Sequence, residues 1–190
     1  MFHKTAISVI ALIALILTNP THAITWDGGY HLFDSGFEDE VGMINAATAD
    51  ITGGYIAALV LYDICSATID GGSLGNSRAF GASSFDIYSG SIVTLHGDDS
   101  SHLNIYGGFI EELDPEDDNT TNLYVESYNW DPDGGNWNGG LITGIWFDSG
   151  ESFSIELVSE GDFNYLTFVP EPGSISLILP GSLVLIKRKQ

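Results

Sequence analysis

Apolar residues recur at every eighteenth position along the middle of the chain, without a gap. The repeat is carried by four segments: Ile51-Thr52-Gly53-Gly54, Ile69-Asp70-Gly71-Gly72, Ile87-Tyr88-Ser89-Gly90 and Ile105-Tyr106-Gly107-Gly108. A second apolar column follows five positions after each Ile: Ile56, Leu74, Ile92 and Ile110. A third column, three positions further on, consists of Leu59, Leu95 and Leu113 and is interrupted by Ser77. An undivided period of this size indicates a solenoid.

The composition of each repeat favours β coils over α coils. β-Branched residues surround the Ile, the Gly-Gly pair would break a helix, and no stretch shows sustained 3.6-residue periodicity. Leu123 extends the register once more, but Val125-Glu126 stands where Gly-Gly is expected. We therefore predict an all-β body, a short right-handed parallel β-solenoid of about 18 residues per coil, with four or five coils at about residues 45–125. The residues by themselves do not determine its handedness.

The residues on either side of each inward Ile point outward, because side chains alternate along a strand. The two outward columns are Asp50, Thr68, Asp86, Asn104 and Asn122 before the Ile, and Thr52, Asp70, Tyr88, Tyr106 and Tyr124 after it. Neither column places two carboxylates on adjacent coils, where a spacing of roughly 4.8 Å would make them repel. Tyr above Tyr and Asn above Asn are expected to form stacked ladders.

The chain changes character after Asn122. A Gly/Asn/Asp-rich loop with interspersed aromatic residues is expected over residues 128–140. Three alternating runs then predict strands at Leu141–Phe147, Phe153–Val158 and Asn164–Phe168, with turns at Asp148-Ser149-Gly150 and Glu160-Gly161-Asp162. Antiparallel strands at this position would cap the last coil and protect its edge.

The N-terminal segment, Met1 to Ala23, has the organisation of a secretory signal peptide. Lys4 precedes an apolar stretch from Ala6 to Leu17, and small residues, Thr21 and Ala23, precede a cleavage point after Ala23. An uncleaved N-terminal anchor is the alternative. Cleavage would leave a mature body of residues 24–168, which is one domain by length.

The C-terminal segment, residues 169–190, has three parts. Pro170-Glu171-Pro172 holds the chain extended, an apolar stretch interrupted by Pro180 follows, and Lys187, Arg188 and Lys189 lie next to the end. The apolar stretch is short for a bilayer, which needs roughly 20 helical residues, and the cations would anchor the end on the cytoplasmic side. The alternative is a terminal apolar strand that closes the core.

These three parts, in this order, resemble the PEP-CTERM sorting signal of Gram-negative bacteria. The resemblance implies export through the Sec translocon, transient membrane anchoring by the C-terminal segment and processing by exosortase. It also implies delivery to the envelope, the cell surface or the extracellular matrix, in connection with extracellular polysaccharide. A looser similarity to environmental PEP-CTERM surface proteins extends over most of the body, including Gly144-Ile145-Trp146-Phe147-Asp148-Ser149-Gly150.

The charge of the body is strongly unbalanced. The chain has a formal net charge of −21, Arg78 is the only Lys or Arg between the terminal segments, and all 26 acidic residues except Glu171 lie there. Such a surface repels nucleic acid and anionic lipid and favours cations. Cys65 is the only cysteine, so no intrachain disulfide forms, and we expect a buried thiol.

The same imbalance argues against an enzyme. Uronate lyases need basic residues, and the body has one arginine. A glycoside hydrolase needs two converging carboxylates, for which Asp98-Asp99, or Asp70 with Asp86, are the candidates. Solvated acids on turns and faces explain these residues better, so we predict no catalytic residues.

Metal binding has little support in the sequence. Residues 131–136 begin like a calcium loop, but Gly135 replaces a ligand and Ile142 stands where the final Glu is needed. Residues 114–119 carry enough oxygens for weak Ca²⁺ binding, although a hydrated loop is favoured. His96 and His102 have no Cys or third His nearby, so no zinc or copper site and no cofactor are predicted.

Glycan binding is the remaining functional candidate. The proposed face consists of Tyr88, Tyr106 and Tyr124 beside Asp86, Asn104 and Asn122, with Trp130 and Trp137 as possible additions. A structural ladder explains the same residues and is favoured. Two functions are therefore carried forward: a non-enzymatic surface or matrix protein, which we prefer, and a module that binds or weakly hydrolyses glycans.

Overall fold

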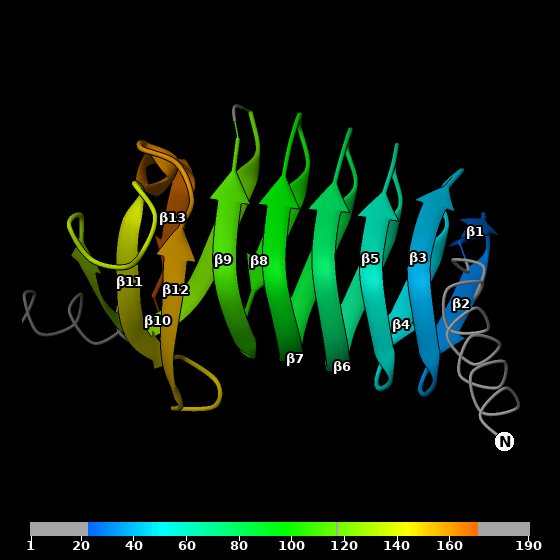
Figure 1. Cartoon of the computed structure of the whole chain (residues 1–190), viewed down its shortest axis with the longest axis horizontal. Helices are drawn as coiled ribbons and strands as arrows, with labels where there is room; N and C mark the ends of the chain where they lie inside the picture. Colours follow the sequence, from blue (N-terminus) through cyan, green and yellow to red (C-terminus); the bar gives the residue numbers. More distant parts are fainter. Residues whose placement is uncertain (1–22, 117, 171–190) are drawn as a thin grey trace, which may run out of the picture.

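A computed structural model describes residues 23–116 and 118–170 (Figure 1). Within these residues the chain forms thirteen strands and one 3-10 helix. Their bounds are β1 (Ala23–Asp27), β2 (Tyr30–Phe33), β3 (Phe37–Ile44), β4 (Thr48–Ile51), β5 (Tyr55–Leu61), β6 (Ser66–Ala79), β7 (Ser84–Gly97), β8 (His102–Ile105), β9 (Phe109–Pro115), β10 (Thr120–Asp131), β11 (Gly140–Trp146), β12 (Ser152–Leu157), η1 (Asp162–Tyr165) and β13 (Leu166–Val169).

The strands form the two faces of a parallel β-solenoid, which confirms the predicted fold class. The first face consists of β2, β4, the first halves of β6 and β7, β8 and the start of β10. The second face consists of β1, β3, β5, the second halves of β6 and β7, and β9. Figure 1 shows the second-face strands side by side in chain order, with the first face behind them.

The solenoid has about six turns rather than the predicted four or five. The turns are in register, and the first-face strand of each begins one period after the last: Tyr30, Thr48, Ser66, Ser84, His102 and Thr120. The first turn was not predicted because its corner, Phe33-Asp34-Ser35-Gly36, has Phe in place of the Ile and Ser in place of the first Gly of the repeat. Phe33 nevertheless pairs with Ile51, and Gly36 has a positive φ of 104°.

The predicted apolar columns form the core. The first column is Phe33, Ile51, Ile69, Ile87, Ile105 and Leu123, and every member is buried. Ser77, which interrupts the third column, is also fully buried, and its hydroxyl has no hydrogen-bond partner among the described residues. Cys65 is buried and free, as expected from the sequence. Among the residues that the structure describes, the hydroxyl of Ser83 is buried without a partner in the same way as that of Ser77, so the core is a stack of similar layers interrupted by a few buried polar side chains.

The corners between the two faces explain the glycines of the repeat. The fourth residue of each repeat has a positive φ, between 73° and 97° at Gly54, Gly72, Gly90 and Gly108. Side chains rarely adopt this conformation, so glycine is favoured there. The third residue lies against the backbone of the preceding turn, and a Cβ built on Gly107 would meet the carbonyl oxygen of Tyr88.

The absence of this glycine pair ends the solenoid. At Val125-Glu126 the chain makes no corner, and β10 continues to Asp131, paired with the antiparallel β11 and with an irregular register between Val125 and Ser127. The predicted loop over residues 128–140 is therefore wrong in its first part, because Tyr128–Asp131 belongs to β10. Antiparallel pairing with β11 holds these residues extended, in spite of their turn-like composition.

The cap consists of the three predicted C-terminal strands. β11 pairs antiparallel with β10 and β12, whereas β12 and β13 add to the solenoid in parallel, on β9 and β10 respectively. The predicted strand start at Asn164 is wrong, because Asp162–Tyr165 forms the 3-10 helix η1 and β13 begins at Leu166. The cap thus extends both faces of the last turns.

The expectations for the two ends of the chain lie almost wholly outside the described residues. The signal peptide before Ala23 and the tail after Pro170, including Lys187, Arg188 and Lys189, are not described. Between residues 23 and 170, leaving out residue 117, no helix has the length and apolar character needed to cross a membrane.

We predict that Gly107→Ala destabilises the solenoid by about 2 kcal/mol, because the added methyl group meets the Tyr88 carbonyl of the preceding turn. Urea unfolding measures the effect. Gly42→Ala is the matched control, since no atom lies within 4 Å of the Cβ position of Gly42 and its φ is ordinary. Equal unfolding midpoints for the two variants would contradict the close approach of successive corners.

Candidate functional site

The three tyrosines of the proposed glycan face form a continuous stack. The ring centroids of Tyr88 and Tyr106 are 4.6 Å apart with an interplanar angle of 5°, and those of Tyr106 and Tyr124 are 4.1 Å apart at 17°. Parallel pairing places each ring one turn above the last. β13 covers the end of the stack, because Val169 pairs with Tyr124. The predicted tyrosine ladder is therefore confirmed.

The polar column beside it forms a second ladder. Asn104 donates its Nδ2 hydrogen bond to Oδ1 of Asp86 at 2.9 Å, and Asn122 donates in the same way to Oδ1 of Asn104 at 2.9 Å. The Asn104 amide thus uses one donor and one acceptor within the column. The stacked pairs satisfy much of the hydrogen-bonding capacity that a sugar would otherwise use.

The stacking restricts what the tyrosines can bind. A sugar ring packs on the flat face of an aromatic ring, but both faces of Tyr106 are covered by its neighbours. A hydrogen bond with Tyr124, followed by burial and the nearby negative charges, raises the pKa of Tyr106 above its ordinary value of 10.0. Tyr88, at the exposed end of the stack, is 47% exposed. Its free face is the one opposite Tyr106, on the side of the ladder away from the cap.

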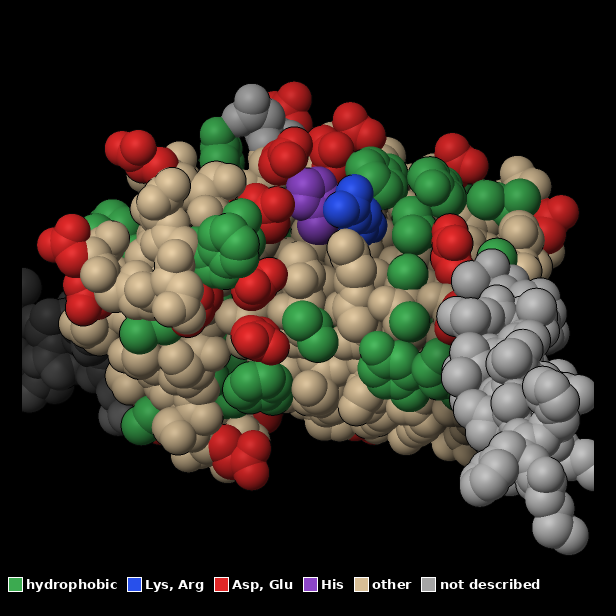
Figure 2. All heavy atoms as spheres, viewed as in Figure 1, with side chains coloured by type: hydrophobic (Ala, Val, Ile, Leu, Met, Phe, Trp, Pro, Cys, Tyr) green, Lys and Arg blue, Asp and Glu red, His purple; other side chains and the backbone are tan. Residues whose placement is uncertain are grey.

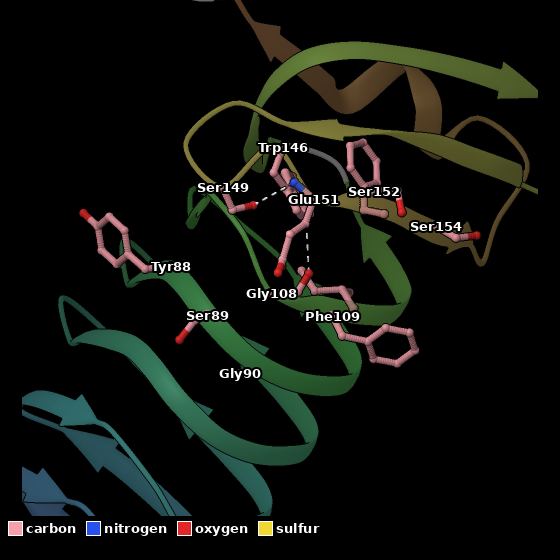
Figure 3. Close-up of a pocket in the computed structure, with 12 residues that line it drawn as sticks. Tyr88, Ser89, Gly90, Gly108, Phe109, Trp146, Ser149, Glu151, Ser152 and Ser154 are labelled. Carbon is pink, nitrogen blue, oxygen red and sulfur yellow. Dashed lines mark hydrogen bonds between the residues drawn. The ribbon is translucent and has the colours of Figure 1, made fainter.

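Tyr88 lines a groove between the solenoid and the cap, with a volume of about 570 Å³ (Figure 3). The solenoid wall comes from the corners of two turns, residues 88–90 and 108–110, and the cap wall from residues 146–154 of β11, β12 and their turn. Trp146 fixes the two walls together, because its Nε1 donates to the Gly108 carbonyl at 3.1 Å. Its ring also stacks on Phe153 at a centroid distance of 4.1 Å.

The groove combines aromatic and polar groups. Phe109, at 57% exposed, supplies an apolar surface. Figure 3 shows Ser89 on the solenoid side and Glu151, Ser152 and Ser154 on the cap side. Hydroxyls and a carboxylate around exposed rings suit a neutral polyhydroxyl ligand. The sequence did not reveal this groove, because it depends on where the β11–β12 hairpin folds back.

The two tryptophans suggested for the glycan face lie elsewhere. Trp130 stacks on Phe163 of η1, with centroids 4.0 Å apart, and donates to the Gly139 carbonyl. Trp137 donates its Nε1 hydrogen bond to Glu112 at 2.9 Å, on the second face. Neither side chain lines the groove or extends the tyrosine ladder.

The acids considered for hydrolysis have local hydrogen-bond partners. Asp70 accepts from Ser89 Oγ at 3.1 Å, and Asp86 accepts from Asn104. Asp98 accepts from the backbone N–H of Asp99 at 2.7 Å. These contacts agree with roles in turns and ladders.

The two acidic loops considered for calcium also use their side chains locally. In the loop after β10, Asn136 donates to Glu156 from both its backbone N and its Nδ2, at 3.0 and 2.8 Å. In the loop after β9, Asn119 points inward and donates to Ser101. Asp114 instead contacts His96, 3.0 Å away on the preceding turn. Each of these side chains therefore has a partner within or next to its own loop.

The contact between His96 and Asp114 is part of a cluster that the sequence analysis missed. Three side chains, His96, Asp114 and Glu116, offer ligand atoms that all lie within 4.8 Å of one another. His96 and His102, by contrast, lie on different faces. The available signal was the period itself, because His96-x-Asp98 and Asp114-x-Glu116 are one period apart.

No family model, curated protein or solved structure matches this chain. The interpretation of both sites therefore rests on their geometry and on the sequence.

A buried acid lies near Asp114 and Glu116 of the His96 cluster. Asp162 of η1 is 3% exposed and accepts from the Ser159 backbone N–H at 2.7 Å. Burial, together with the negative charges of Asp114 and Glu116, raises its pKa from 3.8 to about 6. The field at this end of the second face is therefore strongly negative.

Above pH 10 we expect the wild-type protein to lose stability as the Tyr106 hydroxyl ionises. The Tyr106→Phe variant lacks this hydroxyl, so we predict that it does not show this loss. The pKa of Tyr106 is higher in the folded state than in the unfolded state, where it is about 10. Its contribution to the free energy of unfolding is therefore complete below pH 10 and is lost as the pH rises above 10. Urea unfolding at successive pH values measures the difference, and the phenyl ring preserves the stacking. Equal losses in the two proteins above pH 10 would contradict the ladder hydrogen bond.

Proposed function

We propose that the protein is an exported, non-enzymatic component of the cell surface or extracellular matrix of a Gram-negative bacterium. In this proposal exosortase processes it at Pro170-Glu171-Pro172 and delivers the body to the extracellular polysaccharide. The observation that carries the proposal is the three-part tail, in which a Pro-Glu-Pro motif, an apolar stretch and a basic cluster follow one another at the end of the chain.

The C-terminal end of the fold agrees with this proposal. The last strand, β13, ends at Val169, immediately before Pro170. Cleavage after Ala23 would leave Ile24–Asp27 of β1 in place, and cleavage near Pro170 would leave β13 in place. Both expected processing events are thus compatible with a complete solenoid and cap.

The use of the outward side chains supports a structural role. Tyr, Asn and Asp columns bond along the solenoid, from turn to turn. The strong negative charge keeps such a body solvated and prevents adsorption to anionic lipid and nucleic acid. A rigid, acidic body of this kind suits a hydrated matrix that contains divalent cations.

We expect the exported protein to be truncated near Pro170 in a host that carries exosortase and to keep its tail in a host that lacks it. Intact mass spectrometry measures the difference. Replacing Pro170, Glu171 and Pro172 by Ala should abolish processing, whereas Pro132→Ala, in a cap loop outside the tail, should not affect it. An unprocessed wild-type tail in both hosts would mean that the apolar stretch is an ordinary anchor or a core strand.

A second candidate function is glycan binding in the groove. The observation that favours it is the exposed ring of Phe109 together with serine hydroxyls and Glu151 around one hollow of about 570 Å³. Because the body is acidic, neutral glycans are favoured over anionic ones. This candidate moves the binding surface from the tyrosine ladder to the groove between the solenoid and the cap.

Phe109→Ala is expected to weaken binding of neutral oligosaccharides about tenfold, because it removes the exposed ring from the solenoid wall. Isothermal titration or a glycan array measures the effect. Phe37→Ala is the control, since Phe37 is 60% exposed and lies in the same side-chain column at the other end of the solenoid. Tyr106→Ala and Asp86→Asn test the ladder. An equal loss from Phe37→Ala, or no binding by the wild type, would contradict the groove.

A further inference from the structure

Two short motifs meet at one corner of the second face because they are one period apart. His96 lies on β7 beside Asp114 on β9, in the same parallel register, and Asp98 and Glu116 follow two residues later on the two turns. The Glu116 N–H donates to the Gly97 carbonyl at 2.8 Å, which continues the pairing beyond the strands. Ligand atoms of His96, Asp114 and Glu116 all lie within 4.8 Å of one another, and Asp98 approaches the same ring from the His96 turn, with its Oδ2 3.9 Å from Nε2.

The hydrogen bond to Asp114 determines the tautomer of His96. Nδ1 of His96 lies 3.0 Å from Oδ2 of Asp114. A carboxylate only accepts, so the ring proton is on Nδ1. In the neutral ring, Nε2 is then an acceptor with a lone pair. Nε2 faces Oε1 of Glu116 at 3.8 Å and Oδ2 of Asp98 at 3.9 Å, and neither is a donor.

We propose that a divalent transition metal, with Zn²⁺ as the best fit, binds between Nε2 of His96 and the carboxylates of Asp98 and Glu116. One imidazole and two carboxylates form a donor set typical of zinc. Tetrahedral coordination with bonds of about 2.1 Å places ligand atoms about 3.4 Å apart. The two oxygens, now 3.9 and 3.8 Å from Nε2, each need to approach it by about half an ångström, and the Asp98 and Glu116 carboxylates must also rotate toward each other. The Glu116 side chain is 54% exposed and the Asp98 side chain 33% exposed, which leaves room for this rotation.

Asp114 has a different role in this site. It receives the Nδ1 proton of His96 and holds the ring so that Nε2 points at the two other carboxylates. A carboxylate that accepts from the far nitrogen of a metal-bound histidine both orients the ring and increases its basicity. Phe80 lies against the same ring, with centroids 6.2 Å apart. Asp114 is therefore a positioning residue rather than a ligand.

The charges around the corner favour a cation. Asp98, Asp114 and Glu116 surround one imidazole, and Asp162 adds negative charge from the cap. The nearest basic residue by register is Arg78, which pairs with His96 across one turn, but its Nε donates to Asn76 at 3.1 Å. Figure 2 shows one basic side chain beside one histidine on this face, with acidic side chains close by.

A pair of acidic residues elsewhere on the second face provides a contrast to the His96 corner. Glu112 and Glu156 are register partners, and both carboxylates accept hydrogen bonds from neutral groups nearby. Glu112 accepts from Thr94 and Trp137, and Glu156 accepts twice from Asn136. At the His96 corner the carboxylates of Asp98 and Glu116 instead converge on Nε2, and that of Asp114 contacts Nδ1. That convergence distinguishes this corner from the other acidic surfaces of the described chain.

The test is a titration of the exported, full-length protein with Zn²⁺ at neutral pH, in a large excess of Ca²⁺ that saturates weak adsorption to acidic surfaces. We expect one Zn²⁺ per chain by isothermal titration. His96→Gln should abolish this binding, and Asp98→Asn or Glu116→Gln should weaken it at least tenfold. His102→Gln, an exposed histidine on the other face, should leave it unchanged, and circular dichroism checks the fold of each variant.

Two results would overturn the proposal. Zn²⁺ binding that survives His96→Gln would mean diffuse adsorption to acidic groups, and no binding in excess Ca²⁺ would mean that no selective site exists. Nitrogen chemical shifts of the His96 ring provide an independent measurement. We expect the Nε2 resonance to shift on addition of Zn²⁺ while Nδ1 keeps its proton. An Nε2 resonance that does not respond to Zn²⁺ would mean that ion pairs with the carboxylates occupy the corner instead.

The positioning role of Asp114 has its own readout. Asp114→Asn should weaken Zn²⁺ binding about 10–100-fold and should raise the fraction of His96 with its proton on Nε2. A merely structural role for Asp114 would leave the tautomer of His96 unchanged. An unchanged tautomer together with unchanged affinity would contradict the positioning role.

Discussion

Each turn of the solenoid pairs in parallel with the next turn. This pairing determines where the side chains of the core and of the outer surface lie. Ile69, Ile87 and Ile105 are consecutive layers of one core column because their strands pair in register. The same pairing stacks tyrosine on tyrosine and asparagine on asparagine on the outer surface. It also limits the sequence, since whatever stands at one position lies one strand spacing, about 4.8 Å, from its counterpart in the next turn. The fold, the ladders and the clusters all follow from this constraint.

Much of the fold was predictable because the pairing leaves a periodic signal. The Ile and Leu columns and the glycine corners indicated a parallel solenoid, and Val125-Glu126 marked the point where the coil stops. The first turn was not recognised because it departs from the repeat at two positions. Phe33 stands in place of the Ile, and Gly36 is a single glycine in place of the pair. The straight run of β10 through Tyr128–Asp131 was also missed, since antiparallel pairing overrides the local preference of those residues.

The candidate sites were less predictable, for two physical reasons. The groove at Tyr88 and Phe109 depends on how the β11–β12 hairpin folds back over a solenoid corner, and no local pattern specifies that contact. The cluster at His96 was overlooked because ligand motifs are usually sought along the chain. In a solenoid the relevant neighbours lie one period away, so His96-x-Asp98 has to be aligned with Asp114-x-Glu116. Stacking thus creates sites from residues that appear unrelated in sequence.

The in-register stacking is tested most directly by backbone nuclear Overhauser effects in solution. We expect contacts between residues one period apart throughout residues 48–123, including Ile69 with Ile87 and His96 with Asp114. These contacts should run in the parallel pattern, with both partners advancing together along the chain. Contacts at another spacing, or partners that advance in opposite directions, would contradict the solenoid and the sites that depend on it.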